Sequence, residues 1–320
     1  MKVVWVFWVS FFLFLGIDIQ AQEKKIFTLL SSEKTGISFS NDVVDLKDKN
    51  ILLYSNYYGG AGVGIADFNN DGLQDIFFGG NLVGDQLYLN KGNLTFENIT
   101  KKAGISDNGG WSSGIVLADV NGDGYTDIYI CRELYDDNEE LRRNKLYINN
   151  HDLTFSEQSA KFGIDNNQRT RHATFLDFNN DGFLDLFLLN QPPNPGSYSK
   201  FFGINLKNDL RYASKLYKNV NNTHFIDVSK EAGVLRTSNA NSVSAGDFNN
   251  DGFTDLYIAN DFYLPDFFYL NNQDGTFTNV ANTALNHMSY FSMGVDAADI
   301  NNDGLLDIMV ADMAAEDNVR

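Results

Sequence analysis

Five nearly identical nonapeptides in this sequence place three aspartates, an asparagine and a glycine at fixed spacing. They read "DFNNDGLQD" at 67–75, "DVNGDGYTD" at 119–127, "DFNNDGFLD" at 177–185, "DFNNDGFTD" at 247–255 and "DINNDGLLD" at 299–307. If the chain curls tightly, the side chains at positions 1, 3, 5 and 9 converge with the carbonyl at position 7, and glycine at position 6 permits the positive φ that the curl requires. Hard oxygen ligands in this number favour calcium over magnesium, which needs a stricter octahedron, and over zinc, which prefers sulfur or imidazole.

Two alternatives compete with a calcium-bound β-turn. An EF-hand shares the first six positions but needs glutamate at position 12 and helices on both sides. Position 12 is apolar in all five copies, as Phe78, Ile130, Leu188, Ile258 and Val310. The other alternative is an Asp/Asn/Gly turn that binds nothing. Five copies with aspartate at positions 1, 5 and 9 argue against it, because unliganded carboxylates so close together would repel one another.

The predicted role of the ion is structural. Extracellular calcium modules bind at roughly 0.1 to 1 mM, so with about 1 mM free ion a site at about 0.1 mM contributes roughly 1.4 kcal/mol. Five independent sites would give about 7 kcal/mol, which is comparable with the net stability of a domain. Cys131 is the only cysteine, so no internal disulfide can form. We predict that Cys131 is buried at a strand end and that calcium serves in place of disulfides.

Composition excludes some classes of partner. The 320 residues are 43% hydrophobic, which is enough for a sizeable core, and the formal net charge is −18. Each motif carries three aspartates, so the five motifs hold 15 of the 42 acidic residues. This acidity argues against nucleic-acid binding and against docking on anionic lipid.

The first 21 residues predict a signal peptide. Lys2 precedes an apolar run from Val3 to Ile17, and Ala21 is a small residue at the expected cleavage point. A membrane-spanning helix needs about 20 residues, so an uncleaved anchor ranks second. We therefore expect an exported protein, in the periplasm, at the cell surface or secreted, with no membrane insertion after cleavage.

The repeat around each motif predicts four short strands. An aromatic and β-branched run follows the motif ("IFF", "IYI", "LFLL", "LYIA", "IMVA"), then come a hairpin ("LYLN", "TFENI") and a helical turn that glycine ends ("TKKAG"). Four strands per unit predict an all-β fold, a β-propeller of four-stranded blades over residues 22–320, rather than a parallel β-helix with its shorter rungs. The longer connections at 131–145 and 190–215 are the predicted recognition surface. Its predicted contact residues are Tyr135, Arg142, Arg143, Tyr198 and Phe201.

At this point the sequence resembles a known family. The turn D-x-[DN]-x-DG-x-x-D, followed by "LYLNKG" and "ITKKAGI", resembles the FG-GAP/VCBS repeats of integrin-like β-propellers. The stretch "FTLLSSEKTGISFSN" is similar to the start of large exported bacterial VCBS-repeat proteins with an ASPIC/UnbV-type region, which is not visible here. The resemblance covers residues 26–317 and implies a ring of about seven blades. With only five motifs, it implies an incomplete ring and a further C-terminal region of the same gene product.

The resemblance also implies calcium at every motif. The implied ligands are Asp67, Asn69, Asp71, Leu73 (carbonyl) and Asp75; Asp119, Asn121, Asp123, Tyr125 (carbonyl) and Asp127; Asp177, Asn179, Asp181, Phe183 (carbonyl) and Asp185; Asp247, Asn249, Asp251, Phe253 (carbonyl) and Asp255; and Asp299, Asn301, Asp303, Leu305 (carbonyl) and Asp307. Position 3 is asparagine throughout, where integrin-type copies often have aspartate. This lowers the charge of each site and predicts weaker binding.

No motif in the sequence favours catalysis. "GWSSG" at 110–114 fits the G-x-S-x-G nucleophile elbow, but a strand and an acidic turn follow it instead of a helix. "GAGVG" at 60–64 lacks the helix that a phosphate site needs, so we expect packing glycines. The histidines occupy different repeat positions. We therefore predict a non-enzymatic, calcium-stabilised scaffold that binds a protein or a glycan. The alternative is a polysaccharide hydrolase or lyase with its site in a central channel.

Overall fold

The computed structural model describes residues 26–54, 56–105, 109–192, 210–261, 264–289 and 291–313. The chain divides into two compact units, Met1–Ser31 and Ser32–Arg320, and every sheet lies in the second unit. The predicted signal peptide at 1–21 and the predicted contact residues Tyr198 and Phe201 lie outside the described residues.

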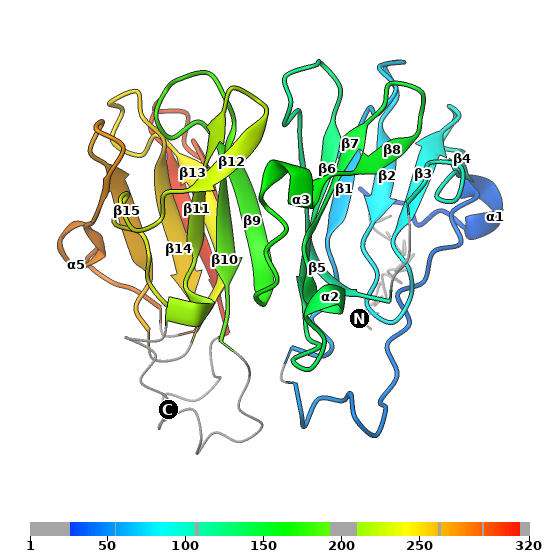
Figure 1. Ribbon diagram of the computed structural model, residues 1–320, viewed down its shortest axis with the longest axis horizontal. Coiled ribbons are helices and arrows are strands. Elements are labelled where there is room, and N and C mark those ends of the chain that lie inside the picture. The colour runs from blue at the N-terminus through cyan, green and yellow to red at the C-terminus, as the bar shows by residue number, and fades with distance from the viewer. Residues whose placement is uncertain are drawn as a thin grey trace, which may run out of the picture. The chain divides into compact units, whose positions relative to one another are not determined.

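Four antiparallel sheets of four strands and one sheet of two strands make up the fold of the second unit (Figure 1). In every sheet the strands lie side by side in chain order, so each sheet is an antiparallel meander. The first sheet consists of β1 (Val63–Ala66), β2 (Asp75–Phe78), β3 (Gln86–Asn90) and β4 (Phe96–Asn98). The second consists of β5 (Trp111–Ala118), β6 (Asp127–Glu133), β7 (Lys145–Asn149) and β8 (Phe155–Glu157).

The remaining sheets repeat this order. The third consists of β9 (Thr170–Leu176), β10 (Asp185–Asn190), β11 (Lys215–Val220) and β12 (His224–Asp227). The fourth consists of β13 (Ala240–Gly246), β14 (Asp255–Asn260), β15 (Phe267–Asn271) and β16 (Phe277–Asn279). The fifth consists of β17 (Ser292–Ala298) and β18 (Asp307–Asp312).

The helical elements in the described ranges are single turns of three or four residues. They are α1 (Ser32–Thr35), α2 (Glu139–Arg142), α3 (Ser159–Phe162), the 3₁₀ turn η2 (Leu210–Tyr212) and α5 (Ala281–Ala284). Gly163 ends α3 with a φ of 74°, as the "AKFG" pattern predicts. Nowhere in the described part of the chain is there a helix with the length and apolar character needed to cross a bilayer.

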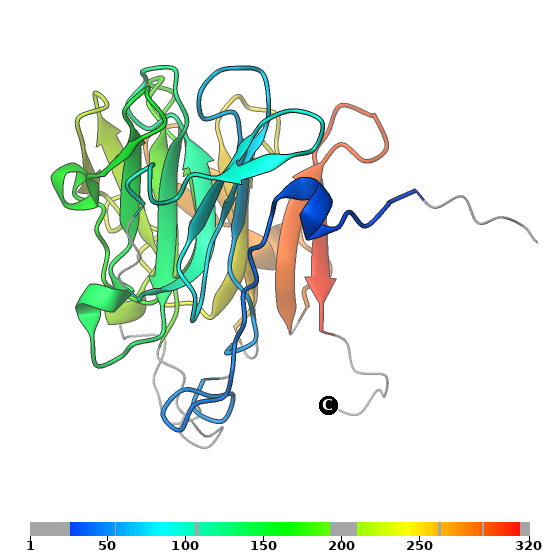
Figure 2. The same cartoon turned by 90° about the vertical axis from the view of Figure 1, so that its right-hand side faces the viewer.

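Successive sheets pack against one another as blades. The first strands β1, β5, β9, β13 and β17 lie beside one another in that order, and Figures 1 and 2 show the sheets standing side by side. This arrangement confirms the predicted all-β fold of four-stranded, propeller-like blades. In the described residues, the fifth motif is followed by a single strand, β18, which pairs only with β17.

The hydrophobic core lies between the sheets. In β6, Ile128 and Ile130 face the first sheet, whereas Tyr129 and Cys131 face the third. Both faces of this strand are therefore covered, which explains why the strand after each motif is a continuous apolar run. Cys131 is fully buried, as predicted, and burial raises the pKa of its thiol.

Neighbouring sheets are also joined by polar side chains at the end opposite the acidic turns. Asp85, just before β3, accepts a hydrogen bond of 2.7 Å from the Ser112 hydroxyl of β5 and pairs at 2.9 Å with the buried Arg132 of β6. The residue just before the third strand makes an equivalent contact to the next blade in each of the other complete sheets. These pairs are Asn144 with Thr170, Ser214 with Ser238 and Asp266 with Ser292.

Candidate functional site: the acidic turns

The five acidic turns connect the first and second strands of the sheets, so they lie at the same end of every blade. In the first turn, Asp67 Oδ1 and Asn69 Oδ1 both accept from the main-chain N–H of Asp71, at 3.1 and 3.2 Å. Asp67 Oδ2 accepts from Gly72 N–H at 2.7 Å, and Asp71 Oδ1 accepts from Leu73 N–H at 2.8 Å. The same four bonds recur in all the other turns. The side-chain oxygens of positions 1 and 3 therefore meet at one N–H group, as the predicted curl requires.

Two positions of each turn have left-handed backbone. The glycine at position 6 has a φ of 85–87°, and position 4 is either asparagine, with a φ of 56–60°, or Gly122, with a φ of 72°. These residue types tolerate positive φ, so the pattern itself encodes the curl. Two of the position-4 asparagines also link adjacent turns, because Asn70 donates to the Gly124 carbonyl at 3.1 Å and Asn180 to the Gly252 carbonyl at 2.9 Å.

The aspartate at position 9 is buried beneath the turn. Asp75, Asp127, Asp185 and Asp255 are each at most 1% exposed. In the first turn, Asp75 Oδ2 accepts from Phe68 N–H at 3.0 Å and Oδ1 accepts from Asn90 N–H at 2.7 Å. The carboxylate thus fastens the beginning of the turn to the end of the third strand. The same pair of bonds forms at the other three buried carboxylates.

Burial makes the charged form of these carboxylates costly. Burial raises the pKa of Asp127 to about 7, and the negative charges of Asp123 and Asp119 contribute to this increase. The two main-chain N–H groups that bond to the carboxylate lower its pKa and offset part of the effect. The pKa of Asp185 is raised to about 7 for the same reasons. A nearby cation would reverse this balance, because it favours the ionised form.

In the second, third and fourth sheets, an asparagine at or next to the end of the third strand joins neighbouring blades, and sequence analysis missed this role. Asn149 Nδ2 donates at 2.8 Å to the carbonyl of Phe68, which is position 2 of the preceding turn. The equivalent bonds run from Asn219 to Val120 at 3.3 Å and from Asn271 to Phe178 at 2.7 Å. The sequence feature that could have predicted this role is the asparagine that ends each of the tetrapeptides "LYLN", "LYIN", "LYKN" and "FYLN".

The turn supplies oxygen donors of the kind that calcium accepts. An ionised carboxylate offers about four lone-pair sites, and the main chain uses two of them at Asp67. In the described ranges, no three His, Cys, Asp or Glu side chains are arranged to hold a metal ion among themselves. An ion in these turns would therefore depend on the position-3 amide oxygen and the position-7 carbonyl as well, which matches the mixed oxygen set that calcium accepts.

Side chains next to the turn distinguish the five copies. In the third turn, Lys218 Nζ lies 3.2 Å from Asp181 Oδ2 and already supplies a positive charge. In the second turn, His151 Nε2 lies 2.8 Å from Asp123 Oδ2, and its ring stacks on Tyr125 at 4.1 Å. Of these two turns, the third is the less favourable for an added cation, because an ammonium group already pairs with one of its carboxylates.

The tempting catalytic and phosphate-binding motifs have structural roles. Ser112 is fully buried in β5, and its hydroxyl donates to Asp85 rather than standing on a strand-to-helix turn. A Cβ on Gly62 would lie 2.4 Å from the Ile115 nitrogen of β5, and one on Gly64 would lie 2.8 Å from the Leu117 side chain. Gly62 and Gly64 are thus packing glycines, as predicted, whereas Gly60 has a φ of 76° and no atom within 4 Å of an added Cβ.

The predicted recognition loop at 131–145 is described in full. Arg142 donates from Nε to the Asn167 carbonyl at 2.6 Å, and Arg143 pairs with Asp165 at 2.7 Å. Both guanidinium groups therefore hold the loop in place, which differs from the contact role that the sequence predicts for them. Tyr135 is half-buried and lines a pocket beside this loop.

The sequence profile of the FG-GAP-like repeat matches residues 41–130, 134–188 and 247–310, and these ranges contain all five acidic turns. The chain belongs to the FG-GAP-like repeat family. The repeated turn and the strands around it are therefore the repeat of this family, as the resemblance implies.

Curated relatives of this FG-GAP repeat protein include cartilage acidic protein 1. The Xenopus tropicalis protein is 27% identical over 234 residues, which cover 72% of this chain and 33% of that protein. The Homo sapiens protein is 30% identical over 152 residues, which cover 47% of this chain and 22% of that protein. The chain thus matches about a third or less of the length of these relatives.

Two solved structures share a distant likeness. One is an Agrocybe aegerita lectin described as recognising non-reducing terminal N-acetylglucosamine, with a TM-score of 0.46, 19% identity, and coverage of 78% of this chain and 59% of that chain. The other is the V. cholerae biofilm matrix protein Bap1, with a TM-score of 0.34, 17% identity, and coverage of 70% and 30% respectively. Both likenesses are too distant to carry an argument about function.

Proposed function

We propose that this FG-GAP repeat protein is an exported, non-enzymatic scaffold that binds a protein or glycan partner and is stabilised by calcium in its acidic turns. The observation that carries the proposal is the identical hydrogen-bonded loop in all five turns, which brings the oxygens of positions 1 and 3 to one N–H group. A cation that bound beside these oxygens would offset the mutual repulsion of the aspartates.

The position of the turns supports a structural role for the ion. Each of the first four turns is fastened through its position-9 carboxylate to the third strand of its own blade. In the second, third and fourth blades, an asparagine of that strand also bonds to the preceding turn. An ion that stiffens one turn therefore stiffens the contact between two blades. The residues that would hold it in the first turn are Asp67, Asn69, Asp71 and Asp75, with the Leu73 carbonyl.

The scaffold role is supported by the burial and the placement of the side chains that could take part in catalysis. The Ser112 hydroxyl and the Cys131 thiol are buried, and the four histidines lie at unrelated positions of the repeat. The signal-peptide pattern of residues 1–21 supports export. The periplasm, the cell surface and the medium are the expected locations.

Calorimetric titration of metal-free protein tests the calcium half of the proposal. Calcium should bind at several sites with Kd values of roughly 0.1 to 1 mM, whereas magnesium should bind much more weakly because the loop offers a mixed and flexible oxygen set. The variant Asp71→Ala should lose one site, and Glu97→Ala, which alters an exposed acid of the same blade, should lose none. Equal heats of binding for calcium and magnesium would contradict the proposal.

A glycan and protein binding panel tests the scaffold half. The protein should retain a partner without changing it, so bound polysaccharide should show no new reducing ends or unsaturated products after prolonged incubation. Release of such products by the wild-type protein would favour the hydrolase or lyase alternative instead.

A further inference from the structure

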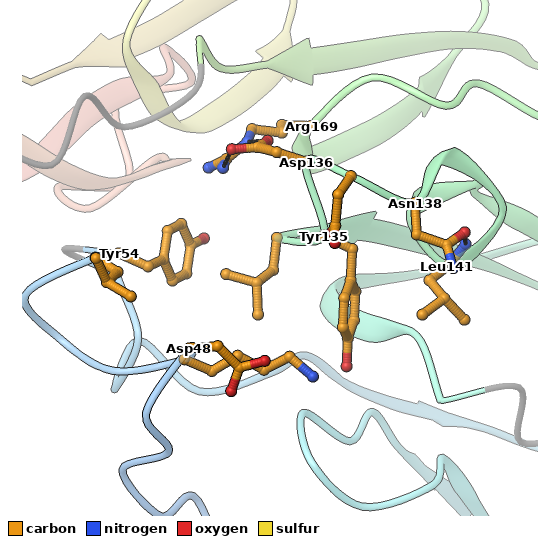
Figure 3. A pocket seen from close by; sticks show the side chains of 11 residues that line it. Asp48, Tyr54, Tyr135, Asp136, Asn138, Leu141 and Arg169 are labelled. Carbon is orange, nitrogen blue, oxygen red and sulfur yellow. Dashed lines mark hydrogen bonds and ion pairs between the residues drawn. The ribbon is translucent and has the colours of Figure 1, made fainter.

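A pocket of about 470 Å³ lies beside the predicted recognition loop (Figure 3). Three segments form it: residues 48–54, which precede the first blade, the loop 134–141 after β6, and Arg169 at the start of the third sheet. Its volume is in the range of small-molecule sites, which is about 300 to 1,000 Å³. The acidic turns do not line this pocket, and the pair of Asp136 and Arg169 that lines it joins the second blade to the third.

Two tyrosines stand on opposite sides of the pocket (Figure 3). Tyr54 is only 3% exposed and is held by an edge-on contact with Trp111, with ring centroids 6.3 Å apart. The guanidinium of Arg169 lies 5.4 Å from the centroid of the Tyr54 ring. Tyr135 has the ammonium of Lys49 at 4.6 Å from its ring. The pocket therefore offers aromatic surface that is already positioned by neighbouring side chains.

The loop that carries Tyr135 is also fixed before any ligand arrives. The Tyr135 carbonyl accepts from Asn138 N–H at 3.1 Å and from Arg142 Nη1 at 3.0 Å. Asp136 binds Arg169 through two hydrogen bonds, of 2.6 and 2.5 Å. A preorganised pocket loses less conformational entropy on binding, so this arrangement favours recognition of a defined ligand.

The charges around the pocket select against most classes of ligand. Asp48, Asp136 and Asp137 line it together with Lys49 and Arg169. Asp136 and Arg169 are paired with each other, so an anion would meet the carboxylates of Asp48 and Asp137, and a cation would meet the ammonium of Lys49 over the Tyr135 ring. An apolar ligand would remove these charged groups from water without replacing their hydrogen bonds, which is costly.

A neutral polyhydroxylated ligand carries no charge to be repelled and can replace the hydrogen bonds that the charged groups make with water. Its hydroxyl groups can donate to the exposed carboxylates of Asp48 and Asp137 and accept from Lys49. Its C–H face can pack on the ring of the half-buried Tyr135, since tyrosine combines an apolar ring surface with a polar tip. Tyr54 is buried and supports the wall behind. We propose that this pocket binds a neutral glycan. The inference rests on the proposed binding function and names the ligand class and the site.

The test uses a panel of immobilised neutral, sialylated and amino-sugar oligosaccharides, with the full chain in calcium. The wild-type protein should bind neutral members, and Tyr135→Ala should raise Kd about fivefold to tenfold through loss of an aromatic contact. Asp137→Asn should also weaken binding. The matched control is Tyr58→Ala, which removes an exposed tyrosine of the same N-terminal segment that does not line the pocket and should leave Kd unchanged.

Each of the following outcomes would overturn the inference for a different reason. Binding to neutral glycans that Tyr135→Ala leaves unchanged would place the site elsewhere, and binding to a protein partner alone would exclude a glycan ligand. Either result would leave the proposed scaffold function intact. Preference for sialylated or amino-sugar members would contradict the argument from charge. Because Tyr135 is half-buried on a surface loop, near-ultraviolet circular dichroism of the variant separates loss of the contact from loss of the fold.

Discussion

At the scale of single residues, the asparagine of the third strand in the second, third and fourth sheets does more than close a hairpin. Asn149 donates to Phe68 of the preceding turn and, at 3.2 Å, to Thr126 of its own blade. Its side-chain carbonyl accepts from His151 N–H at 2.9 Å. One buried amide thus satisfies main-chain groups of two blades, which would otherwise be left without a partner.

We expect Asn149→Ala to lower the free energy of unfolding by about 1 to 3 kcal/mol, because it leaves buried carbonyl and N–H groups unsatisfied. The neighbouring Asn150→Ala is the matched control, because Asn150 is exposed and bonds only within its hairpin. Denaturant unfolding of both variants measures the difference. Equal losses would show that the contact between blades does not depend on this amide.

Lys218 gives a prediction about the third turn. Its ammonium lies 3.2 Å from Asp181 Oδ2, so it competes with a bound cation for that carboxylate. Lys218→Gln should therefore raise the calcium affinity of one site by several-fold in a calorimetric titration. Lys215→Gln, on the same strand but paired with Asp227, should leave all sites unchanged. A lower affinity in Lys218→Gln would mean that the lysine supports the site.

His172 gives a prediction about pH. Burial lowers the pKa of His172, and the charge of Arg171 lowers it further. The folded protein therefore keeps the ring neutral at pH values at which the unfolded chain, with a pKa of about 6.5, binds a proton. The stability that this residue contributes is present above about pH 6.5 and is lost as pH falls below that value toward the folded pKa.

His172→Gln should accordingly reduce the loss of stability between about pH 7.5 and about pH 5.5. The control is His224→Gln, which removes an exposed histidine. Melting temperatures across this range provide the measurement. A steeper fall in His172→Gln than in the wild type would contradict the direction of the pKa shift.

At the scale of elements, each interface between complete blades is held at both ends. The asparagine bonds lie at the end of the acidic turns, and the Asp85–Ser112 contact and its equivalents lie at the other end. The apolar clusters fill the space between. Gly110 belongs to this packing, because a Cβ there would lie 1.6 Å from the Arg132 guanidinium.

The pair of Asp85 and Arg132 is the most deeply buried ion pair of these interfaces, with side chains 3% and 1% exposed. Asp85→Ala should lower stability by about 3 to 5 kcal/mol, because it leaves a buried guanidinium without its carboxylate. Glu97→Ala disrupts the exposed pair with Lys91 and should cost less than about 1 kcal/mol. Comparable losses in the two variants, measured by denaturant unfolding, would contradict this ranking.

The elements were predictable from sequence where the signal is local and repeated. The fixed aspartates and the glycine at position 6 predicted the curl, and the apolar runs predicted the strands. The contacts between blades were not predictable in this way, because their partners are far apart in the chain: Asn149 and Phe68 are separated by 81 residues and Asn219 and Val120 by 99. The pocket was missed for the same reason, since Tyr54 and Arg169 come from different segments.

At the scale of the whole molecule, the FG-GAP-like repeat gives the five acidic turns the same structural setting. They lie at the same end of successive blades, and the first four are tied to one another through buried amides. Cations bound in the turns would thus act together on the contacts between blades rather than on five isolated loops. The expected consequence is a loss of stability over the whole molecule when calcium is removed.

Thermal unfolding with and without a chelator tests this claim most directly. Removing calcium with EGTA should lower the melting temperature by about 10 °C, given roughly 1.4 kcal/mol from each of five sites. Restoring calcium should reverse the shift, and magnesium at the same concentration should not. An unchanged melting temperature and unchanged circular dichroism in EGTA, with no calcium uptake by calorimetry, would contradict the account.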